Sequence, residues 1–201
     1  MPSSKRPRRK ANQARSRRTV EVLLEAAARV LMKRGYSAAS TNRIAEAAGV
    51  SVGTLYEYFA DKEAVFDALI QREIEALVAA IRNADLRADA SLGVTLERLL
   101  RLAMAAMPRG PGFIRALEQV PGSALRRRLV RARAQVVDFI RQLLEARRAE
   151  LRVTNLDLAA LIVVSAAEGI ATNASDELFG DRLAHEVGAL LNLYLTGEEP
   201  R

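Results

Sequence analysis

The sequence predicts an all-α protein of about nine helices. Apolar residues recur at three- and four-residue spacings along most of the 201-residue chain. No stretch alternates apolar and polar residues as a half-buried strand does, and short breaks such as Pro108–Gly112 separate the helical stretches. Because half of the residues are hydrophobic, the chain can also bury a proper core.

The composition argues against several classes of protein. The chain has no cysteine and one histidine, His185. Disulfides and thiolate metal sites are thereby excluded, and no glycine-rich phosphate loop of the GxxxxGK type occurs. We therefore expect no catalysis, no metal and no cofactor. No leading apolar segment follows Met1, and no charge-free apolar run is long enough to span a membrane, so we expect no membrane association and a reducing, cytoplasmic location.

The net charge of +7 is concentrated at the N-terminus. Residues 1–18 carry eight of the 31 Lys and Arg residues and no acid, which leaves 23 cations against 24 acids in the rest of the chain. We interpret residues 1–14 as a basic flexible arm. Such a run can be a solvated tail, but next to a DNA-binding motif its cations can neutralise phosphates or enter the minor groove. Arg17 and Arg18 are the candidates nearest that motif.

A short helix, a turn and a second short helix follow one another between Thr41 and Glu63. Ser40 or Thr41 can cap the first helix, and Gly49 can adopt the positive φ that a tight turn requires. Ser51 is placed to cap the second helix, which we expect to span about nine residues. This is the pattern of a helix-turn-helix motif, whose second helix enters the major groove of DNA.

The second short helix has an inner and an outer face. Leu55 and Phe59, four residues apart, should point into the core. The side chains left on the outer face or the flank are those of Val52, Gly53, Thr54, Tyr56 and Tyr58. Packing is an alternative role for both tyrosines, most clearly for Tyr58, which lies close to the next helix.

In these residues the chain resembles the DNA-binding domain of the TetR (tetracycline repressor-like) family of transcriptional regulators. The stretches IAEAAGVS, GTLYEYF and DKEAVFDAL follow that family's pattern, and the resemblance covers about residues 17–69. It implies a helix-turn-helix DNA-binding domain at 15–62, a fourth, linking helix at 62–82, and a helical effector-binding and dimerisation domain at 83–201. It also implies a bacterial protein that is associated with the nucleoid when bound to DNA.

The resemblance assigns roles to individual residues of the motif. Thr41 and Asn42 should approach the DNA backbone or a base. Val52, Gly53 and Tyr56 should lie nearest the bases, whereas Thr54, Tyr58 and Lys62 should contact phosphates. Because Val52 has no polar side-chain group, it can read a base only by apolar contact, for example with a thymine methyl. We therefore expect the arm and DNA shape to contribute more to specificity.

Of the last two helices, the one expected at about 156–173 is rich in small residues, and the one expected at about 181–195 carries another apolar stripe. The resemblance implies that they pair with their copies in a second subunit, and burial within one chain is the alternative. A twofold dimer would place two recognition helices about 34–36 Å apart and read a palindrome. The candidate interface residues are Ala160, Val164, Ala167, Ala171, Leu183, Val187, Leu190, Leu191 and Tyr194.

The resemblance further implies an unidentified small-molecule effector bound among the middle helices. Candidate lining residues are Met104, Met107, Phe113, Phe139 and Ile140, with Glu168 and Asn173 as polar contacts, although each can also be ordinary core or surface. We therefore expect a sequence-specific transcriptional regulator, a homodimeric repressor that the effector releases from a palindromic operator. The alternative is a sequence-neutral architectural DNA-binding protein, which would bind all duplexes with similar affinity.

Overall fold

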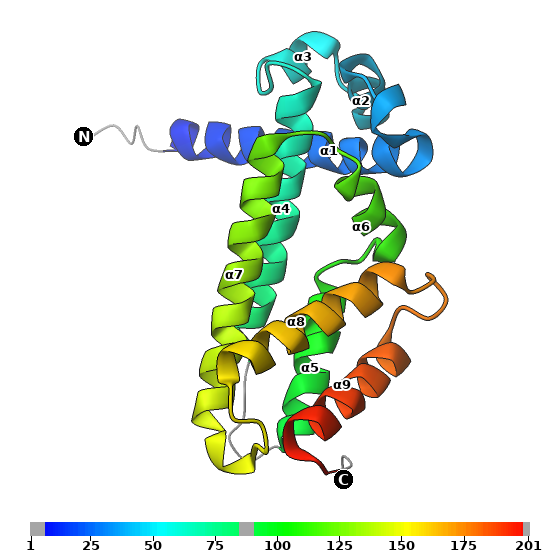
Figure 1. The fold of residues 1–201 in the computed structure, drawn as a ribbon. Helices are drawn as coiled ribbons and strands as arrows, with labels where there is room; N and C mark the ends of the chain where they lie inside the picture. Colours follow the sequence, from blue (N-terminus) through cyan, green and yellow to red (C-terminus); the bar gives the residue numbers. More distant parts are fainter. Residues whose placement is uncertain (1–6, 85–90, 199–201) are drawn as a thin grey trace, which may run out of the picture. The chain divides into compact units, whose positions relative to one another are not determined.

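The computed structural model describes residues 7–84 and 91–198, without the side chains of residues 7–14 and 123–126. Within these residues the fold consists of nine α-helices and one short 3₁₀ turn, with no strand, so the predicted all-α class is confirmed (Figure 1). The elements are α1 (Pro7–Ala38), α2 (Thr41–Ala48), α3 (Val52–Tyr56), α4 (Lys62–Arg82), α5 (Leu92–Ala105), α6 (Gly110–Glu118), α7 (Ser123–Ala146), η1 (Arg148–Glu150), α8 (Leu156–Asn173) and α9 (Asp181–Thr196).

The chain forms two compact units. The N-terminal unit comprises Met1–Ile70 and Ala116–Val120, and the C-terminal unit comprises Gln71–Arg115 and Pro121–Arg201. The division falls inside α4 and inside α6, so each of these helices contributes residues to both units. Helix α4 has the bounds expected of the linking helix.

Helix α1 begins at Pro7, inside the expected flexible arm. Residues 7–14 of the expected flexible arm are therefore helical, which corrects that part of the prediction; residues 1–6 lie outside the described part of the chain. Proline suits the first turn of a helix, and the Arg, Lys, Ala and Gln residues that follow it are good helix formers. The helix is interrupted near its end by Gly35, which has a φ of 71°.

The capping predictions for the helix-turn-helix motif are confirmed. The Ser40 hydroxyl accepts a hydrogen bond from the Arg43 amide at 3.3 Å, and the Ser51 hydroxyl accepts one from the Thr54 amide at 3.0 Å. Gly49 ends α2 with a φ of 68°, in the left-handed region. These three residues define the turn between α2 and α3 locally, and Arg29 of α1 adds a hydrogen bond to the Ala47 carbonyl in the last turn of α2, at 2.7 Å.

Helix α3 is shorter than the nine residues expected. Its regular part has five residues, but the Phe59 amide still donates to the Leu55 carbonyl at 3.0 Å, so a further turn follows it. Leu55 and Phe59 are buried, as predicted, beside the buried Ile44 and Ala45 of α2. The short helix is thus held in place by its inner face.

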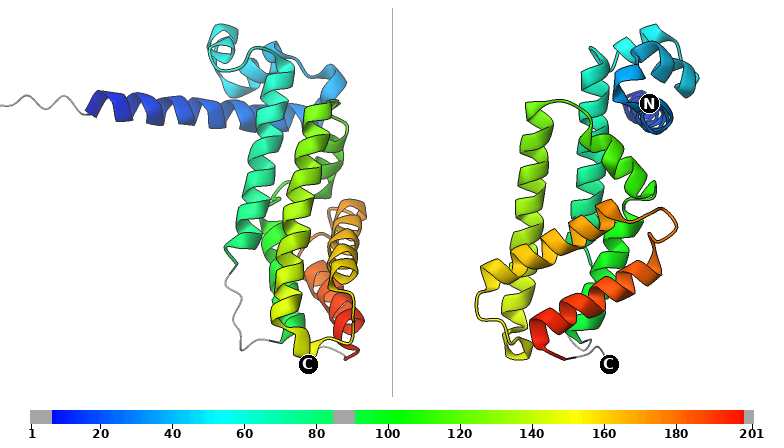
Figure 2. Two further views of the ribbon diagram at one scale, coloured as in Figure 1. Left: turned by 60° about the vertical axis from the view of Figure 1, so that its left-hand side comes forward. Right: turned by 45° about the vertical axis from the view of Figure 1, so that its right-hand side comes forward.

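In the C-terminal unit, α5 packs along α9 and α7 packs along α8 (Figures 1 and 2). The core between these helices is aliphatic, with Leu96, Leu144 and Leu195 almost fully buried. The backbones of α5 and α9 approach closely at Gly188. A Cβ atom added there would lie 3.1 Å from the Glu97 Cα and 3.2 Å from its nitrogen. Gly188 therefore sets the distance between the two helices.

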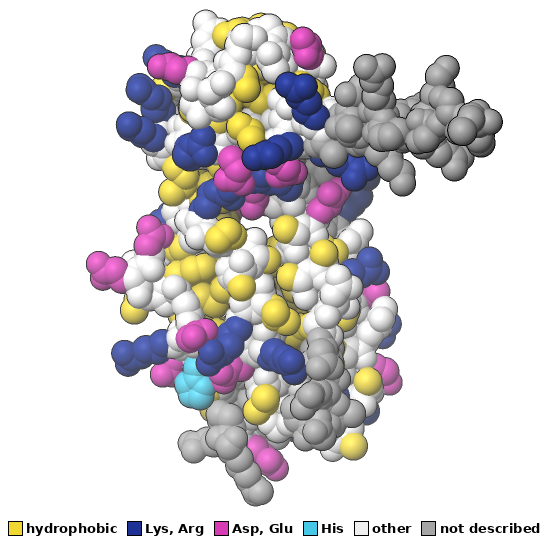
Figure 3. All heavy atoms as spheres, turned by 180° about the vertical axis from the view of Figure 1, so that it is seen from behind, with side chains coloured by type: hydrophobic (Ala, Val, Ile, Leu, Met, Phe, Trp, Pro, Cys, Tyr) yellow, Lys and Arg dark blue, Asp and Glu magenta, His cyan; other side chains and the backbone are white. Residues whose placement is uncertain are grey.

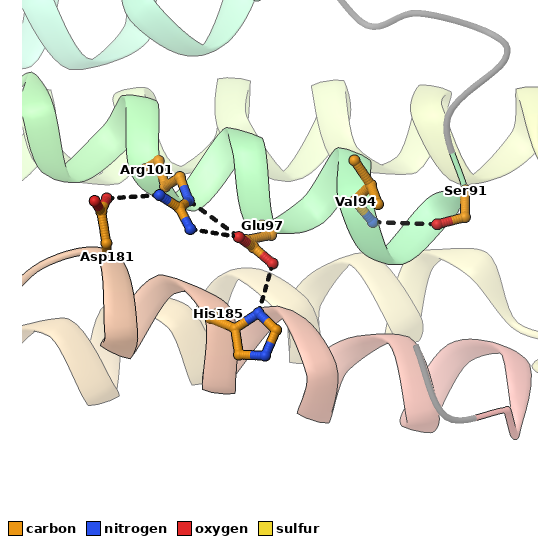
Figure 4. Close-up of polar contacts among 6 residues, drawn as sticks. All are labelled: Ser91, Val94, Glu97, Arg101, Asp181 and His185. Carbon is orange, nitrogen blue, oxygen red and sulfur yellow. Dashed lines mark hydrogen bonds and ion pairs between the residues drawn. The ribbon is translucent and has the colours of Figure 1, made fainter. Parts of the chain in front are cut away.

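A polar cluster joins the same two helices at the surface (Figure 4). The Glu97 carboxylate accepts hydrogen bonds from Arg101 Nη2 at 2.6 Å and pairs with His185 Nδ1 at 2.8 Å, while Arg101 Nη1 lies 2.9 Å from Asp181 Oδ1. His185 is visible at the surface among charged side chains (Figure 3). The hydrogen bond with His185, and then that with Arg101, lowers the pKa of Glu97 below its usual value.

We expect Gly188→Ala to destabilise the protein by about 1–3 kcal/mol, the usual cost of overpacking, because the new methyl group meets the backbone of α5. Gly93→Ala is the matched comparison in the same contact. Its methyl group would meet side-chain atoms of Asn192 at 3.1–3.3 Å and no backbone atom of the facing helix, so we expect a smaller loss of stability. Urea unfolding measures both effects. Equal destabilisation by the two variants would contradict the assigned role of Gly188.

The lowered pKa of Glu97 predicts a loss of stability in acid. The pKa of Glu97 is lower in the folded than in the unfolded chain. Its contribution to the free energy of unfolding is therefore complete above the unfolded pKa of about 4.5, and it disappears as the pH falls through the folded pKa. Thermal unfolding of the wild type and of Glu97→Gln between pH 6 and pH 3 should show a difference that shrinks at low pH. A difference that is constant with pH would contradict the effect of this carboxylate.

Candidate DNA-binding surface and effector cavity

The candidate DNA-binding surface is formed by the start of α2 and the outer face of α3, both in the N-terminal unit. Asn42 and Gly53 are exposed, and the Tyr56 side chain is 52% exposed. Thr41 and Tyr56 meet across the motif, where the Thr41 hydroxyl and the Tyr56 hydroxyl lie 3.1 Å apart. Tyr56 is therefore a surface residue whose hydroxyl is held in position by α2.

Gly53 is not required by the packing of the chain. Its φ is not in the positive region, and an added Cβ atom would meet only the Ser51 hydroxyl, at an ordinary 3.6 Å. Because nothing in the described part of the chain explains the missing side chain, the space above it is available to another molecule. Val52 is half-buried beside it, and the Thr54 hydroxyl lies 2.9 Å from that of Ser51.

Lys62, one of the residues predicted to contact phosphates, is engaged within the unit. The Lys62 ammonium lies 4.2 Å from the centre of the Tyr36 ring and donates to the Tyr36 carbonyl at 3.2 Å. The Tyr36 ring in turn packs edge-on against Phe66, with ring centres 5.2 Å apart. Tyr58 is half-buried. Lys62 therefore has a structural role in this fold, whatever its role toward DNA.

The cations around the motif include one that the sequence analysis did not single out. Arg17 and Arg18 are exposed on α1, as a phosphate contact requires. Arg43 is also exposed, directly after Asn42, and donates to the Ala38 carbonyl. Arg43 lies in the first turn of α2, next to Thr41 and Asn42, which are predicted to contact DNA. That position is the signal that could have marked Arg43 as a further candidate for a DNA contact.

The C-terminal unit contains a cavity of about 130 Å³ with an almost wholly apolar lining. It brings together four of the seven predicted effector residues: Met104, Met107, Ile140 and Glu168. The other three lie elsewhere. Phe113 is buried, Phe139 packs half-buried against the core, and Asn173 is exposed, where its amide donates to the Gly169 carbonyl at 2.8 Å.

Six of the nine predicted interface residues line this cavity. Val164, Val187 and Leu191 are buried there, whereas Ala167, Ala171 and Leu183 are half-buried. Of the other three, Ala160 is fully buried, Leu190 is exposed and Tyr194 is half-buried. The six residues that line the cavity are Val164, Ala167, Ala171, Leu183, Val187 and Leu191.

Further lining residues were not predicted as ligand contacts, although several lie on the apolar stripes that predicted the helices. They are Leu77, Ile81, Leu96, Leu99, Leu100, Ala103, Val136, Val163, Ile170 and Ala184. The periodicity of α4, α5 and α7 marks such positions as inward. It does not show that the stripes of these helices meet around one space.

Exposed apolar side chains form a second surface of the C-terminal unit. We call it the outer apolar face; it consists of Leu158, Leu161, Ile162, Leu190 and Leu193, which are 36–54% exposed. Within the described residues, α8 alone has the length and mean hydropathy, 1.4, of a membrane span. The opposite side of α8, with Ala159 and Val163, is buried in the core. Its hydropathy thus reflects two apolar faces.

Two family models match the chain. The model of bacterial regulatory proteins of the tetR family matches residues 23–69, and that of the tetracyclin repressor-like C-terminal domain matches residues 91–195, more than half of the chain. The chain belongs to the TetR family. Its N-terminal match covers the helix-turn-helix motif, and its C-terminal match covers most of the cavity and the outer apolar face.

Curated relatives are similar over part of their length. The nucleoid occlusion factor SlmA of Haemophilus ducreyi is 32% identical over 109 residues, which cover 54% of this chain and 52% of that protein. The transcriptional repressor KstR2 of Mycobacterium tuberculosis is 39% identical over 98 residues, covering 49% and 46%. The chain spans about half the length of such relatives.

Solved structures extend the likeness to the whole fold. The fatty acid degradation regulator FadR from Bacillus halodurans superimposes with a TM-score of 0.70 at 22% identity, over 86% of this chain and 93% of that one. FadR from Bacillus subtilis, in complex with stearoyl-CoA, gives 0.71 at 18% identity, over 87% and 98%. These matches show the fold that the chain adopts.

We expect Gly53→Ala to weaken DNA binding about tenfold while stability stays unchanged or rises by up to about 1 kcal/mol, the helix-propensity gain of alanine. The added methyl group has room within the chain but occupies the space through which α3 would approach DNA. Fluorescence anisotropy with labelled duplex and thermal unfolding measure the two quantities. Unchanged affinity would remove Gly53 from the DNA contact.

Proposed function

We propose that the protein is a homodimeric transcriptional repressor that binds a palindromic DNA operator and is released by a small-molecule effector. The observation that carries this proposal is the capped helix-turn-helix motif of a TetR-family chain with Tyr56 and Gly53 exposed on its outer face. The proposed place of action is the bacterial cytoplasm, at the nucleoid while DNA is bound.

Contacts with bases and with phosphates come from different residues in this proposal. Val52, Gly53 and Tyr56 lie nearest the bases, together with Thr41 and Asn42 at the start of α2. The phosphate contacts are those of Thr54, Tyr58 and Lys62, with Arg17 and Arg18 on α1. Val52 and Gly53 provide no polar side chain, so we infer that DNA shape contributes to specificity.

A second copy of the chain is the proposed occupant of the outer apolar face. Its five exposed apolar residues lie on the two helices that the family resemblance assigns to dimerisation, and an exposed apolar patch often marks an interaction surface. Ser165 and Gly169 are also exposed on α8 and are small enough for a close approach. The proposed interface thus uses the outer face of α8 and α9 in place of the core residues first expected.

The cavity is the proposed effector site. At about 130 Å³ it is smaller than the range of roughly 300–1,000 Å³ usual for ligand pockets, so binding requires its walls to move. Met104 and Met107 are suited to this, because methionine side chains are flexible and adapt to irregular spaces. One structural neighbour, the FadR of Bacillus subtilis, has been solved with stearoyl-CoA bound.

Sequence-neutral DNA binding is the second candidate. The small number of polar side chains on the outer face of α3 favours it, since direct base readout requires donors and acceptors. Salt dependence alone does not separate the two candidates, because phosphate contacts dominate both.

Selection of bound sites from random duplex DNA at fixed salt is the test of this function. We expect a palindrome with half-sites about one helical turn apart, bound roughly 10³-fold or more tightly than random duplex. Recovery of unrelated sequences with similar affinities would contradict a sequence-specific regulator and favour the sequence-neutral alternative.

We expect Leu161→Asp to dissociate the dimer, because it places a charge in a buried apolar contact, and to raise the dimer dissociation constant by about 100-fold or more. Leu178→Asp is the matched control. Leu178 is 61% exposed between α8 and α9 but lies outside the outer apolar face. Sedimentation at micromolar concentration measures both variants. A monomeric wild type, or equal dissociation by both variants, would contradict the proposed interface.

A further inference from the structure

The lining of the cavity restricts the chemistry of its ligand. All of its residues are apolar with one exception, Glu168 on α8. Burial of hydrocarbon among such side chains is favourable, in proportion to the apolar area removed from water. We therefore expect the part of a ligand that occupies most of the cavity to be hydrocarbon, and Glu168 is the lining residue that can match its polar group.

Glu168 lines the cavity with a side chain that is 49% exposed, and its recorded neighbours leave part of the carboxylate for a ligand. Its Oε2 accepts a hydrogen bond from Arg133 Nε at 2.8 Å, and Arg133 Nη2 donates to the exposed Ser165 hydroxyl at 2.6 Å. The Ser165 hydroxyl donates in turn to the Leu161 carbonyl at 2.6 Å. Arg133 does not line the cavity. The guanidinium is thus committed to Glu168 and Ser165, outside the lining.

A carboxylate accepts hydrogen bonds and donates none. The arginine bond recorded in the described part of the chain is made to Oε2, which leaves Oε1 for a ligand. A ligand carboxylate or phosphate would place like charges together, whereas an ammonium or hydroxyl group can donate. Bonds between oppositely charged groups are stronger than neutral ones, so an ammonium group gains more than a hydroxyl.

We propose that the cavity selects a hydrocarbon-rich ligand with one hydrogen-bond donor at its end, an alkyl amine or an alkyl alcohol, and discriminates against fatty acids and other anions. This inference rests on the proposed function, because it names the class of effector that such a regulator binds. Glu168 is the residue that determines the specificity.

Three probes of equal chain length test the inference. The full-length protein is titrated with octylamine, 1-octanol and octanoate by isothermal calorimetry at neutral pH and fixed salt. We expect one site per chain, with octylamine bound most tightly and octanoate at least about tenfold more weakly, the difference expected from one charge-assisted hydrogen bond. Amine and alcohol are separate arms, so the experiment also shows which donor the site prefers.

Glu168→Gln keeps the shape of the side chain and removes its charge. We expect the affinity for octylamine to fall about tenfold and that for 1-octanol to change less. Asp157→Asn is the matched control, because Asp157 lies on the same helix, is exposed and does not line the cavity. It should leave all three affinities unchanged.

Three outcomes would overturn the inference: octanoate binding as tightly as octylamine, equal behaviour of Glu168→Gln and Asp157→Asn, or no binding of any probe. The selection of DNA sites reports on the proposed function separately. A protein that selects a palindrome but binds no probe would overturn the ligand class alone. A protein that binds the probes but selects no DNA would overturn the regulatory function alone.

Discussion

Helix α8 has apolar side chains on two opposite faces, and most features of the C-terminal unit follow from the need to cover both. Its inner face, with Ala159, Ala160 and Val163, is fully or almost fully buried in the core. The same side of the helix supplies Val164 and Ala167 to the cavity wall. Its outer face, with the exposed Leu158, Leu161 and Ile162, has no cover within the described part of the chain. In the proposed dimer the second copy covers the outer face, as the core covers the inner one.

The same helix connects the two proposed binding events. Glu168 lines the cavity, and its partner Arg133 bonds to Ser165 on the exposed side of α8. A ligand group that forms a hydrogen bond with the Glu168 carboxylate would therefore be linked through Arg133 and Ser165 to the proposed dimer surface. The close contact at Gly188 joins α5 and α9, two helices that both line the cavity.

In the N-terminal unit, the caps and the turn of the helix-turn-helix motif depend on short-range interactions instead. Ser40, Gly49 and Ser51 define α2, the turn and α3 by hydrogen bonds and backbone conformation within a few residues. Leu55 then anchors α3, and the bond between Thr41 and Tyr56 holds its outer face to α2. The outcome is a rigid surface with few polar groups of its own, which favours recognition through backbone position and DNA shape.

The sequence by itself determined most of the helices, the caps of α2 and α3 and the helix-turn-helix motif, because these depend on residues close together in the chain; it missed the helical start of α1 at Pro7. It also predicted which side of each helix is apolar. It did not determine what covers an apolar side: Val187 and Leu191 were expected at a dimer interface and line the cavity, and Phe113 was expected in the cavity and is buried outside it. Periodicity predicts that one face of a helix is apolar and buried. Only the tertiary structure decides whether a neighbouring helix, a cavity or a second chain lies against that face.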